Sequence, residues 1–130
     1  MFVKSLSLSK IVTSAFEKLG KPYIYGDIGK KGYDCSGLTY SIYLNDLDIK
    51  LPRSSGSQIN AGTKIEKSEL IPGDLVFFNT TGKGISHVGL YIGEGNMIHA
   101  SSGSIRKVII STIDSGYYNQ RYVTARRIIK

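Results

Sequence analysis

Hydrophobic residues are spaced in two different ways along this chain. In the first half they recur every three or four positions, which is the period of an amphipathic helix. The first such run predicts a helix from about Leu8 to Leu19, with Ser7 as its N-cap and Gly20 as its stop. Residues 21–32, rich in glycine, are predicted to form a loop.

Two further helices are predicted before the spacing changes. Asp34 is placed to cap a helix that begins at Cys35, since an aspartate accepts from the free N–H groups of a first turn. Ser54 or Ser55 could cap a short helix that extends to about Ala61.

The second half carries the spacing of strands. Gly93-Glu94-Gly95 is a tight turn, so residues 86–100 are predicted to form a hairpin. Helices that come first and strands that follow predict an α+β domain, with N-terminal helices packed on an antiparallel β-sheet. The five runs rich in β-branched and aromatic residues are 75–78, 86–92, 96–100, 108–113 and 122–129.

The length and the net charge of the protein limit its domain count and its possible partners. Its 130 residues, 41% hydrophobic, are enough for one core, so residues 1–130 are predicted to form a single domain. The net charge of +7 favours anionic partners such as nucleic acid, anionic lipid or cell wall. The basic residues are spread out and form no nucleic-acid motif, so no nucleic acid is expected as partner.

The first ten residues contain no apolar segment with a cleavage site and no lipobox cysteine. We therefore expect no signal peptide in this chain, and no stable membrane insertion, because no stretch is long enough to span a bilayer.

Cys35 is the single cysteine and the first candidate for chemistry. It is predicted in the first turn of a helix, where free N–H groups and the positive end of the helix dipole favour a thiolate. Ser36 and Gly37 are small and leave room for a substrate backbone, and the N–H groups there could bind an oxyanion. The competing interpretation is a buried structural thiol.

The two histidines, His87 and His99, both fall in the predicted hairpin. With a turn centred on Glu94, residues 89 and 99 are opposite, so the histidines share a face as diagonal neighbours roughly 7–8 Å apart. One could act as base to Cys35 while the other orients it. Gly89 between them is expected to leave space. A zinc site of one cysteine and two histidines stays open as an alternative.

Other residues could bind the substrate. Tyr23 could donate a hydrogen bond to the oxyanion, or be an ordinary aromatic contact. Arg53 and Ser54 could contact a substrate carboxylate, or Ser54 could cap the third helix. Asp34 could bind a substrate amine, although a helix cap is its simpler role. Ser36 completes this set of candidates.

These same segments resemble the NlpC/P60 family of cell-wall cysteine peptidases over nearly the whole chain. The tail, 108–129, is most similar to the Spr-like murein endopeptidases. Asp27 departs from the pattern, because the family often has a second glycine there. The matching segments are Pro22-Tyr23-Ile24-Tyr25-Gly26, Asp34-Cys35-Ser36-Gly37, Leu51-Pro52-Arg53-Ser54-Ser55, Pro72-Gly73-Asp74-Leu75-Val76-Phe77-Phe78, Ser86-His87-Val88-Gly89-Leu90-Tyr91-Ile92-Gly93 and Met97-Ile98-His99-Ala100-Ser101.

The resemblance implies a papain-like fold, with Cys35 as nucleophile, His87 as base, His99 as its orienter and Tyr23 at the oxyanion. It implies no metal and no cofactor. The substrate would be a peptidoglycan stem peptide at the cell wall, cut at the γ-D-glutamyl-diamino acid bond or at the D-alanyl-diaminopimelate crosslink. Separately, we expect the protein to be a monomer.

Three alternatives remain open on the sequence alone. One is an amidase or acyltransferase of the papain-like class acting on another amide. Another is a cell-wall-binding module without catalysis. The last is a toxin-like domain held by an inhibitor or immunity protein.

Overall fold

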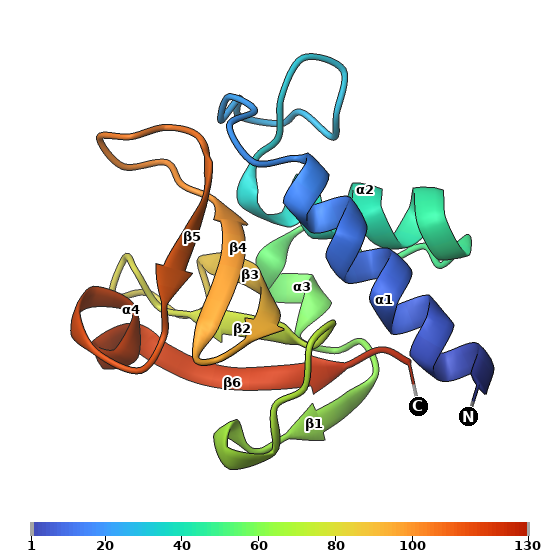
Figure 1. The fold of residues 1–130 in the computed structure, drawn as a ribbon. Coiled ribbons are helices and arrows are strands. Elements are labelled where there is room, and N and C mark those ends of the chain that lie inside the picture. The colour runs from blue at the N-terminus through green and yellow to red at the C-terminus, as the bar shows by residue number, and fades with distance from the viewer. Residues whose placement is uncertain (1, 130) are drawn as a thin grey trace.

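The computed structural model describes residues 2–129, with side chains described from residue 5 onward. Two long helices, α1 (Phe2–Glu17) and α2 (Cys35–Leu47), lie side by side along one side of a sheet (Figure 1). The remaining elements are α3 (Ser55–Gln58), β1 (Thr63–Ile65), the short 3-10 helix η1 (Lys67–Glu69), β2 (Leu75–Phe78), β3 (His87–Gly93), β4 (Asn96–Ala100), β5 (Val108–Thr112), α4 (Gly116–Arg121) and β6 (Tyr122–Arg127).

The described strands form one sheet of six strands in the order β1-β6-β2-β3-β4-β5, and every neighbouring pair is antiparallel. The predicted α+β class with helices packed on an antiparallel sheet is therefore confirmed. The chain passes from β5 through α4 and returns as β6, which lies between the edge strand β1 and β2 (Figure 1).

Each face of the sheet carries its own hydrophobic cluster. Between the sheet and the helices, Phe77 and Leu90 pack with Ile11 and Ile42. On the other face, Phe78 packs in a smaller cluster with residues that include Met97. The alternation of a strand sends the neighbours Phe77 and Phe78 to opposite faces, and both are fully buried.

α1 departs from the predicted 8–19 helix at both ends. It begins earlier, at Phe2, and Leu8 packs against Gly73 at the entry to β2. It ends at Glu17, and Gly20, at a φ of +87°, turns the chain toward β5. Phe16, although it falls at the helical spacing of the apolar residues, is 45% exposed.

The other predicted elements lie within a few residues of their observed bounds, and α3 ends at Gln58, earlier than Ala61. β1, η1 and α4 were not predicted. β1 has three residues and two are exposed, so it carries too little hydrophobic alternation to be read as a strand. α4 has six residues and no buried one, and therefore shows no apolar stripe.

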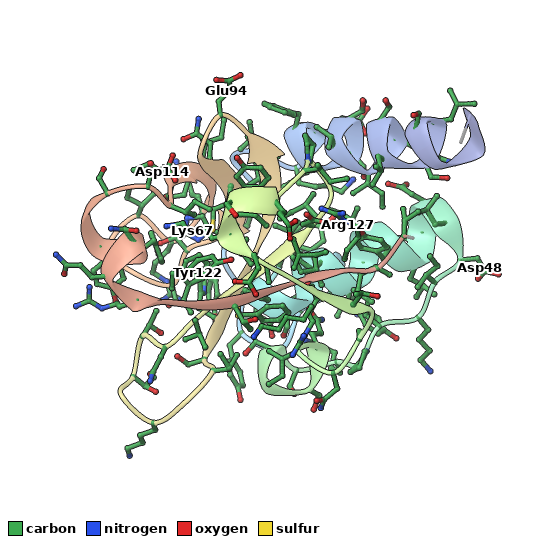
Figure 2. The ribbon with its side chains drawn as sticks, turned by 90° about the horizontal axis from the view of Figure 1, so that it is seen from below. Asp48, Lys67, Glu94, Asp114, Tyr122 and Arg127 are labelled. Carbon is green, nitrogen blue, oxygen red and sulfur yellow. The ribbon has the colours of Figure 1, made fainter. Side chains whose placement is uncertain are left out.

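A buried ion pair ties the end of β6 to the start of β2. Arg127 donates from Nε to Asp74 Oδ1 and from Nη2 to Oδ2, both at 2.9 Å. The Asp74 side chain is 1% exposed. Figure 2 shows Arg127 and, along the same strand, Tyr122 with Lys67 beside it; the Lys67 ammonium lies 4.9 Å from the ring centre. These contacts hold β6 in the sheet.

Candidate active site

Cys35 is the first residue of α2, as predicted. Asp34 is the N-cap, and its Oδ1 accepts a 2.6 Å hydrogen bond from the N–H of Gly37. The Asp34 cap fixes Cys35 as the first residue of the helix. The Cys35 side chain therefore lies in the first turn, where the backbone N–H groups have no partner within the helix.

The Asp34 carboxylate also joins three segments of chain. Oδ2 accepts from the N–H of Gly26 at 2.9 Å and from Nη2 of Arg53 at 2.8 Å. Nη1 of Arg53 lies 3.2 Å from Asp34 Oδ1 and 2.9 Å from Ser36 Oγ. Of the predicted substrate-binding residues, Asp34 and the Ser36 hydroxyl are therefore engaged within the protein, whereas the Arg53 side chain stays 40% exposed.

A hollow of about 450 Å³ opens beside Cys35. It brings together all of the predicted nucleophile, oxyanion and substrate residues except the histidines. Ser54 lies on its rim and caps α3, accepting from the N–H of Ser57 at 3.2 Å. The lining residues are Tyr23, Tyr25, Gly26, Asp34, Cys35, Ser36, Arg53, Ser54, Ser55 and Ser86.

Tyr23 lies close enough to Cys35 for their charges to interact. Burial raises the pKa of the Tyr23 phenol, and the nearby Cys35 and Asp34 raise it further. The hydroxyl is therefore protonated at neutral pH and can donate a hydrogen bond. The Arg106 guanidinium lies 5.1 Å from the ring centre and holds the ring in place.

Asp27, where the sequence departs from the family pattern, organises the loop beside the hollow. Its carboxylate accepts backbone hydrogen bonds from Gly29, Lys30, Lys31 and Gly32 at 2.8–3.1 Å. These N–H groups, that of Lys31 above all, lower the Asp27 pKa to about 2. The charge therefore stabilises the loop from within instead of pointing to a ligand.

The two histidines form a buried pair. His87 Nε2 lies 2.8 Å from His99 Nδ1, and the rings meet edge to face with centres 4.9 Å apart. β3 and β4 pair with Leu90 opposite Ile98, which continues to residue 89 opposite 99, as the hairpin pattern predicts. His99 is fully buried and His87 is 6% exposed.

Gly89 does not leave an empty space, contrary to the prediction. A Cβ at this position would overlap Met97 Sδ and lie 3.3 Å from His99 Cβ. The small residue is required because the Met97 side chain of the neighbouring strand already fills that place.

Cys35 contacts both chain neighbours of His87. Its Sγ lies 4.0 Å from the carbonyl oxygen of Ser86, and the N–H of Val88 donates toward the sulfur. Because His87 Nε2 is engaged by His99, Nδ1 is the His87 nitrogen left for the cysteine. The site thus has a thiol beside the backbone on either side of His87, and a second imidazole paired with that of His87.

Burial disfavours both the thiolate form of Cys35 and the imidazolium form of His87. It raises the pKa of the Cys35 thiol, despite donors that include the N–H of Val88, and it lowers the pKa of His87 to about 4. Burial, and the neighbouring His87, also lower the pKa of His99. The N–H groups at the helix start do favour a thiolate, as expected, but desolvation is the larger effect on the pKa.

The alkylation rate of Cys35 is therefore expected to depend on pH in a defined direction. Iodoacetamide reacts with thiolate, and a raised pKa keeps the thiolate fraction small at neutral pH. The rate should climb about tenfold per unit between about pH 7 and about pH 9 without a plateau. Quenched time courses read by mass spectrometry measure it, with free cysteine as the reference thiol. A plateau already reached below pH 7 would show a resting thiolate instead.

Two side chains missed from the sequence complete the site. Ser111 on β5 places its Oγ 2.7 Å from His99 Nε2. Tyr118 on α4 stacks on His87 with ring centres 5.6 Å apart and an interplanar angle of 24°, and meets His99 edge to face at 4.9 Å. The strand alternation of residues 108–113 could have indicated Ser111, whereas the sequence around Tyr118 gave no helix signal.

Two further features of residues 2–129 bear on the open alternatives. Nowhere in this range do three or more His, Cys, Asp or Glu side chains gather in a way that could hold a metal ion. None of the helices in this range is long and apolar enough to cross a membrane.

Solved structures share this architecture. A Bacillus cereus protein of the NlpC/P60 family superposes with a TM-score of 0.87 at 38% identity, covering 95% of this chain and 40% of that one. Such a likeness over nearly the whole chain defines a papain-like α+β fold.

The family follows from sequence. Residues 20–127 match the model of the NlpC/P60 family. The chain is 42% identical over 110 residues to the "Probable endopeptidase NlpC" of Escherichia coli, covering 84% of this chain and 70% of that protein. The protein belongs to the NlpC/P60 family, as its motifs predict.

Two other relatives carry more specific names. The gamma-D-glutamyl-L-lysine dipeptidyl-peptidase of Bacillus cereus is 42% identical over 113 residues, 85% of this chain and 33% of that protein. The murein DD-endopeptidase MepH of Escherichia coli is 38% identical over 117 residues, 87% of this chain and 43% of that protein. The chain thus spans less than half the length of these two relatives.

Proposed function

We propose that this protein is a cysteine endopeptidase that hydrolyses amide bonds in the stem peptides of bacterial peptidoglycan. The observation that carries the proposal is Cys35 at the capped start of α2, opening into the 450 Å³ hollow and contacting both neighbours of His87. Membership in a family whose matched relatives are named endopeptidases supports the reaction. The substrate places its action at the cell wall.

In the proposed reaction His87 Nδ1 takes the Cys35 proton as the sulfur attacks the amide carbonyl carbon. Since thiol and imidazole are both neutral at rest, proton transfer accompanies attack. The Tyr23 hydroxyl and the N–H groups at the start of α2 stabilise the oxyanion. The C–N bond breaks, and the leaving amine takes the proton from His87. Water, deprotonated by His87, then splits the thioester into a carboxylic acid and the free thiol.

Two hollows, one beside Cys35 and one beside His87, fit the two sides of the scissile bond. The one lined by Tyr23 and Arg53 receives the acyl side. A second, of about 420 Å³, adjoins His87 and is lined by hydroxyl-bearing residues such as Ser101 and Tyr118. Because His87 protonates the amine, this second hollow receives the leaving residue.

For the scissile bond we propose γ-D-glutamyl-diamino acid, for which the Bacillus cereus relative supplies the support. The D-alanyl-diaminopimelate crosslink is the second candidate, because MepH is named a murein DD-endopeptidase. We also infer that residues 1–130 form one catalytic domain, because one sheet carries both hydrophobic clusters. We further propose that it acts as a monomer, and that a thiol and two imidazoles carry out the reaction without a metal or cofactor.

Digestion of defined muropeptides separates these bonds. Purified uncrosslinked tripeptide and crosslinked dimer are incubated with the protein, and product masses are read by mass spectrometry. Release of the L-Ala-D-Glu side from both substrates supports the γ-D-glutamyl bond. Conversion of dimers to monomers alone supports the crosslink. Intact substrates in both reactions would contradict the proposed function.

A further inference from the structure

Ser111 lies behind the two histidines, on the strand next to His99. β4 and β5 pair with Met97 opposite Ser111 and His99 opposite Ile109. Ser111 and His99 are therefore diagonal neighbours on one face of the sheet, a relation in which side chains can reach each other. The 2.7 Å distance between Ser111 Oγ and His99 Nε2 is that of a hydrogen bond.

His87, His99 and Ser111 thus form a chain of two hydrogen bonds. The first joins His87 Nε2 and His99 Nδ1, and the second joins His99 Nε2 and Ser111 Oγ. A neutral imidazole carries one proton, so the direction of each hydrogen bond fixes the next. If His99 donates from Nε2 to Ser111, its Nδ1 is bare and accepts from His87 Nε2. His87 Nδ1 is then bare as well, the form that a base to Cys35 requires.

The opposite direction would disable the base. A proton on His99 Nδ1 would point at His87 Nε2 and leave the His87 proton on Nδ1, toward the cysteine. Such a histidine cannot accept the thiol proton at that nitrogen. Both histidines are neutral at neutral pH, because burial lowers the pKa of each. Each ring therefore carries one proton, and its position decides whether His87 can act as base.

The nearby Tyr118 does not compete for His99 Nε2. Tyr118 covers both rings, but its hydroxyl is engaged with Ser101. Among the residues that the structure describes, Ser111 is the hydrogen-bond partner found at this nitrogen.

We propose that Ser111 is a positioning residue for the peptidase reaction. Its hydroxyl accepts the Nε2 proton of His99, and this hydrogen bond sets the tautomers of both histidines so that His87 presents a bare nitrogen to Cys35. The inference rests on the proposed function, since it assigns Ser111 a part in that reaction.

The test replaces Ser111 and reads both rate and tautomer. In Ser111→Ala, kcat for muropeptide cleavage should fall about tenfold to a hundredfold, as when an outer hydrogen bond that orients a histidine is lost, with little change in KM. Ser111→Thr keeps the hydroxyl and should restore most of the rate. Thr112→Val, which removes a hydroxyl from the next residue of β5, should leave the rate unchanged.

Nitrogen-15 NMR reports the tautomers directly, and the chain has two histidines to assign. The native protein and Ser111→Thr should show His99 protonated at Nε2, and Ser111→Ala should show a shift toward Nδ1. An Ala variant with native kcat and native tautomer would overturn the inference, and so would a folded Thr variant as slow as Ala. Either result leaves the proposed function standing, whereas that function fails if the native protein cleaves no muropeptide.

Discussion

Replacing Cys35 by alanine is expected to abolish muropeptide cleavage, with kcat falling by roughly four to six orders of magnitude. The thioester can form at no other thiol, because Cys35 is the single cysteine of the chain. The fold should survive, since the side chain is half-buried and its loss removes one sulfur atom from contact. Cleavage is measured by product masses, and the fold by circular dichroism.

Cys35→Ser is the matched control, because it changes the sulfur to oxygen and leaves the rest of the side chain in place. It keeps a hydrogen-bonding side chain of similar size, but a hydroxyl is a far weaker acid than a thiol, and His87, whose pKa burial lowers to about 4, is too weak a base for it. We expect it to be inactive as well. Substantial turnover by folded Cys35→Ala would rule out the thiol mechanism.

Arg127→Met is expected to destabilise the protein by about 3–5 kcal/mol, which corresponds to a fall in Tm of about 10 °C or more. The substitution leaves the Asp74 carboxylate without its cation, and that side chain is 1% exposed. The N–H of Ile71, which donates to Asp74 Oδ2 at 2.9 Å, remains as a partner but supplies no full charge. The free energy of unfolding is measured by urea denaturation.

Two further variants test the reason for this loss. Lys64→Met removes an exposed charge from β1 and should change stability by less than about 0.5 kcal/mol. Adding Asp74→Asn to Arg127→Met should recover part of the loss, because no buried charge is then left unpaired. An Arg127→Met protein as stable as Lys64→Met would show that the ion pair contributes nothing.

The sequence predicted the elements that carry strong hydrophobic periodicity. The hairpin from 86 to 100 and its register followed from alternation about Glu94, and this register alone places His87 and His99 on one face. The start of α2 at Cys35 followed from Asp34, because a capping residue marks a helix boundary locally.

What the sequence did not predict depends on contacts between distant segments. The resting charge of Cys35 is decided by how deeply the strand beside it buries the sulfur, and a helix position alone does not report this. Asp34 serves at once as helix cap and as partner of Arg53, a pairing that exists only after the chain has folded. Ser111 likewise reaches His99 from β5, the strand that pairs with β4.

Trapping the acyl-enzyme tests the central claim most directly. Hydroxylamine competes with water for a thioester, so native protein cleaving a muropeptide in its presence should release the acyl-side fragment partly as a hydroxamate. The hydroxamate share, read by mass spectrometry, should rise with hydroxylamine concentration, and Cys35→Ala should form none. Continued cleavage that gives the free acid alone at every hydroxylamine concentration would mean that water attacks the amide directly, and would contradict a covalent intermediate on Cys35.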